Sequence, residues 1–140
     1  MAKTTFGVIV GNRGFFPDAL AKEGRRGILS VLKKSGYKTV ALSMNETKYG
    51  AVETFQEAKK CGAVFAKNSE KIDGIIVTLP NFGDEKGVAE AVKRSGLRVP
   101  VLIHAEADEK NSMLMGRRRD SFCGKISVCN NLVQAGIAFT

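Results

Sequence analysis

Short apolar segments alternate with amphipathic segments along the whole chain, and this alternation constrains the fold more than any single motif. Strands are expected at residues 4–10, 38–42, 74–79, 99–104 and 137–140, and helices at residues 18–35, 51–68, 85–95 and 125–135. Strands and helices that alternate at this spacing favour a parallel sheet with right-handed crossovers. The sequence therefore predicts a single three-layer α/β domain of the flavodoxin-like type, with a five-stranded parallel sheet in the order 2-1-3-4-5.

No helix follows the predicted fifth strand at residues 137–140. A parallel strand needs cover on both faces, because its side chains point to both. We therefore expect either a domain truncated after its fifth strand or a sheet that another subunit completes.

Two loops carry residues that a tight connection does not need: residues 11–17 after the first strand and residues 80–84 after the third. In the predicted strand order, the topological switch point lies between strands one and three, and ligands bind beyond the carboxyl ends of the strands there. Because both loops meet at that point, the sequence predicts a binding site. The alternative interpretation is a glycine-containing turn whose phenylalanines cap the core.

Arg13 is the residue in these loops best suited to binding. Its planar guanidinium stays charged at any working pH and offers five donors to the hydroxyls or carboxylate of a small polar ligand. Phe15, Phe16 and Phe82 have the flat apolar faces that sugar rings favour. For Phe16, however, core packing is the favoured interpretation.

Known cofactor motifs are missing from the first loop. Gly11 and Gly14 lack the spacing of the dinucleotide-binding motif, and the chain contains no GxxxxGK[ST] segment. His104, with Glu106 and Asp108 just beyond it, has the residue types of a divalent-metal site. A strand-end histidine followed by a solvated acidic loop is the favoured interpretation, so the sequence predicts no cofactor and no metal in this chain.

The formal net charge of +8 is scattered along the chain, apart from the block Arg117-Arg118-Arg119. Because no nucleic-acid motif accompanies these cations, no specific nucleic-acid partner is expected. The role of the block stays open: either Arg119 and Asp120 pair and fix the loop, or the loop is solvated. Asp120 or Ser121 is a candidate cap for the following helix.

The three cysteines lack the spacing of a redox pair or a zinc knuckle, so free thiols are expected. No segment has the roughly 18 consecutive apolar residues of a membrane span. The first residues lack the apolar region of a signal peptide. These observations favour a cytoplasmic protein with no membrane partner.

Four separated segments carry a family resemblance: 5–17 (TFGVIVGNRGFFP), 46–54 (ETKYGAVET), 77–85 (VTLPNFGDE) and 118–125 (RRDSFCGK). They resemble, in the same order, the N-terminal domain of L-fucose/L-arabinose isomerase-like proteins. The likeness covers nearly all 140 residues. It implies a flavodoxin-like first domain that further α/β domains follow.

The resemblance also implies a function. Members of this family are similar to metal-dependent aldose–ketose isomerases, usually manganese enzymes that assemble as oligomers and move a proton between adjacent sugar carbons through an enediol. The family's metal ligands belong to later domains, so the resemblance assigns no catalytic residue and no metal ligand here. It implies instead a lid whose first loop contacts the sugar in a neighbouring subunit. Arg13 matches that role, with Asn12, Asn81 and Phe82 as companions.

Without the later domains, residues 1–140 are not expected to catalyse alone. The expected partners are a small sugar, the later isomerase domains in cis or in trans, and further copies of the chain. The chain is then a piece of a longer protein, one half of a split gene, or a domain with a separate use. The alternative function is a stand-alone sugar-binding or oligomerisation module.

Overall fold

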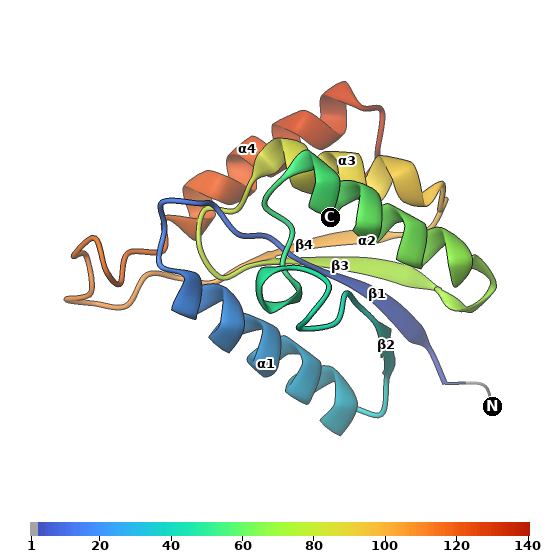
Figure 1. Cartoon of the computed structure of the whole chain (residues 1–140), viewed down its shortest axis with the longest axis horizontal. Coiled ribbons are helices and arrows are strands. Elements are labelled where there is room, and N and C mark those ends of the chain that lie inside the picture. Colours follow the sequence, from blue (N-terminus) through green and yellow to red (C-terminus); the bar gives the residue numbers. More distant parts are fainter. Residues whose placement is uncertain (1–2) are drawn as a thin grey trace.

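The structure is a computed structural model that describes residues 3–140, and Figure 1 shows a parallel sheet between two layers of helices. The strand order is β2-β1-β3-β4, and each neighbouring pair is parallel. This confirms the α/β class, the parallel sheet and the order of the first four strands. In chain order, the elements are β1 (Thr5–Val10), α1 (Asp18–Lys34), β2 (Lys38–Val40), the 3₁₀ turn η1 (Lys48–Gly50), α2 (Phe55–Lys67), the 3₁₀ turn η2 (Ser69–Lys71), β3 (Gly74–Leu79), α3 (Glu85–Ser95), β4 (Val101–Ala105) and α4 (Ser121–Gln134).

The two faces of the sheet are covered unequally. α1 lies on one face, and α2, α3 and α4 lie side by side on the other (Figure 1). Successive side chains of a strand point to opposite faces, so Val8 and Val10 pack under α1 while Ile9 packs under the other three helices. All residues of β3 are buried. Cover on both faces explains why these strands are apolar without alternation.

The predicted fifth strand is wrong for the structure. Of its residues, Thr140 alone pairs with the sheet: its N–H donates to the Val101 carbonyl at 2.9 Å, and its carbonyl accepts from the Ile103 N–H at 2.8 Å. Ile137 and Phe139 pack against the larger core cluster instead. Pairing at one residue does not make a strand, so the order within the described residues is 2-1-3-4 rather than 2-1-3-4-5.

The second helix begins later than its apolar pattern predicts. It starts at Phe55 because Thr54 and Glu57 form a capping box. The Thr54 hydroxyl accepts from the Glu57 N–H at 3.3 Å, and the Glu57 carboxylate accepts from the Thr54 N–H at 2.9 Å. Just before the box the chain is extended, and Val52 forms a parallel bridge with Gly11. Val52, expected in the first turn of the helix, therefore bridges to the residue after β1 instead.

Neither of the aspartates at the starts of α1 and α4 caps its helix through its side chain. Asp18 lies in the first turn of α1, and no side chain caps that helix. α4 begins at Ser121, earlier than predicted, and Asp120 precedes it in a left-handed conformation (φ 48°) without a side-chain cap. The Asp120 carboxylate pairs with Arg118 at 2.7 Å instead.

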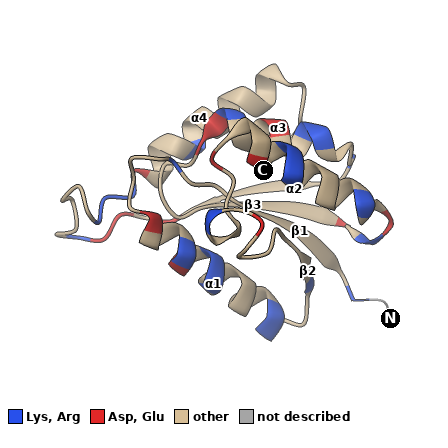
Figure 2. Ribbon diagram, in the orientation of Figure 1, with Lys and Arg blue, Asp and Glu red and all other residues tan. Residues whose placement is uncertain are grey.

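Lysines and arginines lie on several helices and on the loop after β4, rather than on one face (Figure 2). Within residues 3–140, no helix combines the length and the apolar character that crossing a membrane requires.

α1 approaches the loop after β3 very closely at Gly24. A Cβ atom on Gly24 would lie 2.6 Å from Cβ of Pro80 and 2.7 Å from Oε1 of Glu106. Gly27 lies on the same helix, and a Cβ atom there would have no such neighbour within 4 Å. The missing side chain at Gly24 thus allows α1 to support Pro80.

This packing predicts opposite effects for two equivalent substitutions. Gly24→Ala should lower the free energy of unfolding by about 1–3 kcal/mol, because the new methyl group must displace Pro80. Gly27→Ala should raise it by about 0.5–1 kcal/mol, since alanine favours the helix and meets nothing. Urea unfolding followed by circular dichroism measures both. Equal stabilities of the two variants would contradict the close approach.

Candidate functional site

The loops after β1, β3 and β4 gather at the carboxyl end of the sheet, on the left in Figure 1. The first loop is tied to the neighbouring strands at its start. Gly11 N–H donates to the Thr78 carbonyl at 2.9 Å, and Asn12 N–H donates to the Val52 carbonyl at 3.0 Å. The backbone of β1 is therefore held in the sheet up to the residue before Arg13.

Asn12 and Asn81 join the two predicted ligand loops. Their side chains are buried, and the Asn81 amide donates to Asn12 Oδ1 at 2.7 Å. Asn81 Oδ1 accepts from the Gly83 N–H at 3.1 Å, while the Asn12 amide donates to Asp18 at 3.1 Å and to Glu53 at 2.9 Å. These contacts give both amides a structural role. Their predicted contact with a ligand stays a prediction.

An ion pair supports Asn12 from the side of η1. Lys48 pairs with the Asp18 carboxylate, whose other oxygen accepts from Asn12. The hydrogen bond from Lys48, and to a smaller degree that from Asn12, holds the pKa of the Asp18 carboxyl below its usual value. Asp18 therefore links the first loop, the start of α1 and the η1 turn.

Arg13 stands at the end of β1 among aromatic rings. Its guanidinium carbon lies 5.0 Å from the centre of the Phe82 ring and 5.8 Å from that of Phe15. Phe16 stacks on Phe82 with ring centres 5.8 Å apart. One nitrogen of Arg13 pairs with Glu85, at the start of α3, and the side chain remains 31% exposed. A charged donor group is thus presented to solvent beside apolar ring faces.

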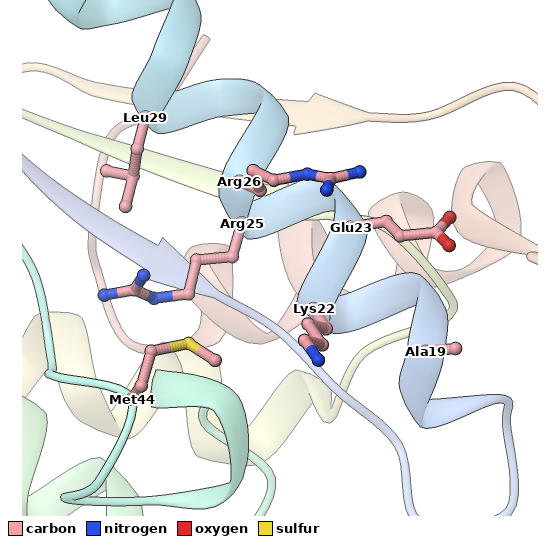
Figure 3. Close-up of a pocket in the computed structure, with 7 residues that line it drawn as sticks. All are labelled: Ala19, Lys22, Glu23, Arg25, Arg26, Leu29 and Met44. Carbon is pink, nitrogen blue, oxygen red and sulfur yellow. The ribbon is translucent and has the colours of Figure 1, made fainter.

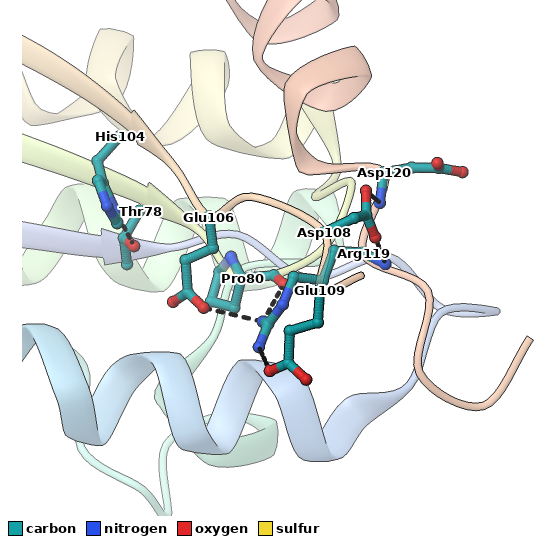
Figure 4. Close-up of polar contacts among 8 residues, drawn as sticks. All are labelled: Thr78, Pro80, His104, Glu106, Asp108, Glu109, Arg119 and Asp120. Atoms are coloured by element: carbon teal, nitrogen blue, oxygen red, sulfur yellow. Dashed lines mark hydrogen bonds and ion pairs between the residues drawn. The ribbon is translucent and has the colours of Figure 1, made fainter. Parts of the chain in front are cut away.

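The loop after β3 is held from behind by Arg119, which is 9% exposed (Figure 4). Arg119 Nη1 donates to the Pro80 carbonyl at 2.9 Å and pairs with Glu106 at 2.8 Å. Glu109 lies 3.7 Å from its other terminal nitrogen. Of the two alternatives left open for this block, the pairing of Arg119 with Asp120 is wrong, because Glu106 and the Pro80 carbonyl bind the Arg119 guanidinium. Arg119 therefore fixes the residue that precedes Asn81.

The residues considered for a metal site have separate partners (Figure 4). His104 Nδ1 lies 2.9 Å from Thr78 Oγ1, and Glu106 binds Arg119. The Asp108 carboxylate accepts from the Arg119 N–H at 2.8 Å and from the Asp120 N–H at 3.2 Å. Among residues 3–140, no group of three or more histidine, cysteine, aspartate or glutamate side chains is arranged to hold a metal ion.

Several contacts at this edge were missed by reasoning from the sequence. Glu85 lies in the first turn of α3, where the helix dipole alone favours a carboxylate, and its pairing with Arg13 depends on tertiary structure. The glycine of α4 at position 124 packs on the third-strand loop: a Cβ atom on Gly124 would lie 2.8 Å from the Phe82 Cα. No local sequence pattern predicts either contact, because each joins segments that are far apart in the sequence.

Asn81→Ala tests the structural role of the amide pair. The variant leaves Asn12 Oδ1 and the Gly83 N–H without their partner, so we expect the free energy of unfolding to fall by about 2–3 kcal/mol. Asn130→Ala is the matched control, because Asn130 is exposed on α4 and should change stability by less than about 0.5 kcal/mol. Chemical denaturation measures the free energy of unfolding of both variants. Similar losses in the two would contradict a structural role of the buried Asn12–Asn81 pair.

Two comparisons with known proteins bear on the family to which this chain belongs. No curated protein matches the chain closely enough to count as a relative. A family model described as the N-terminal domain of fucose/sulfoquinovose isomerase matches residues 7–140, which confirms the resemblance found in the four sequence segments. The chain therefore belongs to the fucose/sulfoquinovose isomerase N-terminal domain family.

Proposed function

We propose that this chain is the substrate-contacting N-terminal domain of an aldose–ketose isomerase. The observation that carries the proposal is Arg13, a partly exposed arginine beside Phe82 at the carboxyl end of the sheet, in a chain of this family. The domain would not catalyse alone, and the isomerase domains would be supplied in cis or in trans. Its three free thiols are compatible with a cytoplasmic location.

The chemistry of this edge suits a polyol. The guanidinium donors of Arg13 that Glu85 leaves free can bind sugar hydroxyls, and the rings of Phe15 and Phe82 can cover the apolar C–H face of the sugar. Asn12 and Asn81 would act chiefly by fixing the positions of these groups. We assign binding, orientation and exclusion of water to this domain. We assign proton transfer and the Mn²⁺ of the complete enzyme to the later domains.

An exposed apolar surface beside Arg13 supports docking on a neighbouring subunit. Phe15 is 73% exposed, and Met115, on the loop after β4, is 80% exposed. Together with Phe16 and Arg118 they line a small cavity of about 150 Å³. Clusters of exposed apolar side chains mark protein interfaces. We infer that the domain works in a homo-oligomer, with this surface and Arg13 facing the active site of the next subunit.

Arg13→Ala tests the proposal. The test uses a protein that carries this domain together with its isomerase domains. There the variant should lower kcat/KM by a factor that corresponds to a loss of about 1–3 kcal/mol in transition-state stabilisation, because a charge-assisted hydrogen bond to the sugar is lost. Its effect on the free energy of unfolding should stay below about 1 kcal/mol, since the Arg13 ion pair is partly exposed. Steady-state kinetics and a melting curve measure the two effects.

Arg94→Ala is the matched control. Arg94 also pairs with a carboxylate, at 2.5 Å from Glu90, and its guanidinium carbon lies 4.9 Å from the Phe55 ring centre. Arg94 has the same kinds of contact as Arg13. It lies in the last turn of α3, however, whereas Arg13 pairs with Glu85 in the first turn. The control should change stability to a similar degree and leave kcat/KM unaltered. An Arg13→Ala variant with the kinetics of this control would refute the proposed contact.

A further inference from the structure

A cavity of about 630 Å³ lies between α1 and the segment that follows β2 (Figure 3). Its lining combines the cations Lys22, Arg25 and Arg26 with the apolar side chains of Leu29 and Met44. In Figure 3, Arg25 extends from α1 toward Met44. None of the residues proposed to bind sugar lines this cavity, so it is a separate feature of the molecule.

The charges around this cavity are unbalanced. Three cations line it against one carboxylate, Glu23. Within residues 3–140, none of Lys22, Arg25 and Arg26 pairs with a carboxylate, whereas Lys48, also close to α1, pairs with Asp18. A cavity whose lining carries an excess of one charge concentrates ions of the opposite sign. The cavity therefore attracts anions.

Arg25 is the least solvated of the three cations. Its Nη2 donates to the Leu42 carbonyl at 2.8 Å. Its Nε is buried and has no hydrogen-bond partner in the described part of the chain. Burial also lowers the pKa of the guanidinium from its ordinary value. A cation withdrawn from water without a counter-charge is unfavourable, and a bound anion would offset that cost.

The backbone next to Arg25 has an uncommon conformation. Tyr49 is in the left-handed region (φ 56°), followed by Gly50 at φ 66°. A Cβ atom on Gly50 would lie 2.8 Å from Arg25 Nε, so the turn fits closely around this side chain. The same turn brings the Tyr49 ring to 5.6 Å from Lys22 Nζ. Left-handed conformations at bulky residues are strained, and such strain is concentrated at binding sites.

We propose that this cavity binds an oxyanion group, phosphate above all, either free or carried by a small metabolite. Arg25 Nη2 already donates to the Leu42 carbonyl and Nε is enclosed, so Nη1 is the Arg25 nitrogen left to bind a phosphate oxygen. Lys22 and Arg26 add positive charge to the lining. Leu29 and Met44 give the body of a metabolite an apolar wall. The volume lies within the range of roughly 300–1,000 Å³ typical of small-molecule sites. The proposal does not depend on the sugar-contacting role of Arg13.

Nuclear magnetic resonance titration of the ¹⁵N-labelled chain tests this site. Inorganic phosphate, glucose 6-phosphate and glucose are added separately, with sodium chloride keeping the ionic strength constant. We expect saturable shifts of the Arg25 Nε–H signal and the Met44 amide with both phosphate compounds, and none with glucose. Tighter binding of glucose 6-phosphate supports a phosphorylated metabolite as the occupant, and equal binding supports free phosphate.

Two double variants with the same change in charge separate the cavity from the general positive charge of the chain. Lys22→Gln with Arg26→Gln should raise the phosphate Kd about tenfold or more. Lys33→Gln with Lys34→Gln, in the last turn of the same helix, should raise it less than about twofold. All four side chains are exposed, so both variants should fold. Equal losses in the two variants, or no saturable shift with either phosphate compound, would overturn the proposal.

Discussion

The buried hydrogen bond between the Asn81 amide and Asn12 Oδ1 is the contact on which the carboxyl edge of this domain depends. It joins the loop after β1 to the loop after β3. These two strands are neighbours in the sheet but far apart in the sequence. Because a buried amide without partners is costly, each asparagine constrains the other. The Asn12 amide then extends the network to Glu53. Two loops become one rigid platform as a result.

Different residues of this platform fix the loops and face solvent. Behind it, Arg119 fixes the Pro80 carbonyl, and the close approaches at Gly24 and Gly124 leave the loop after β3 little room to move. In front, Arg13 keeps part of its guanidinium exposed beside Phe82. Preorganisation of this kind lowers the entropic cost of binding. An edge that offers one charged guanidinium beside an aromatic face suits the contact we propose with a sugar that other domains hold.

The sequence predicts the regular parts of this domain well and its long-range contacts poorly. β3 and α3 have the predicted bounds, because an unbroken β-branched run marks the strand and Gly96, at φ 66°, ends the helix. The predicted fifth strand is wrong because a short segment with two large apolar residues, Ile137 and Phe139, also suits packing on a core. Asn12 and Arg119 look like loop residues with free side chains, yet both are buried by partners that no local pattern reveals. The position of Arg13 follows from topology, whereas its pairing with Glu85 does not.

The most direct test of the account is a side-chain nuclear magnetic resonance titration, with an aldose and its matching polyol, of a protein that carries this domain together with its isomerase domains. The account predicts a saturable shift of the Arg13 Nε–H signal together with the backbone amides of Phe15 and Phe82. The side-chain amide signals of Asn12 and Asn81 should keep their positions and their slow hydrogen exchange, because these groups hold the platform. Saturable shifts elsewhere with an unaltered Arg13 signal would contradict the central claim.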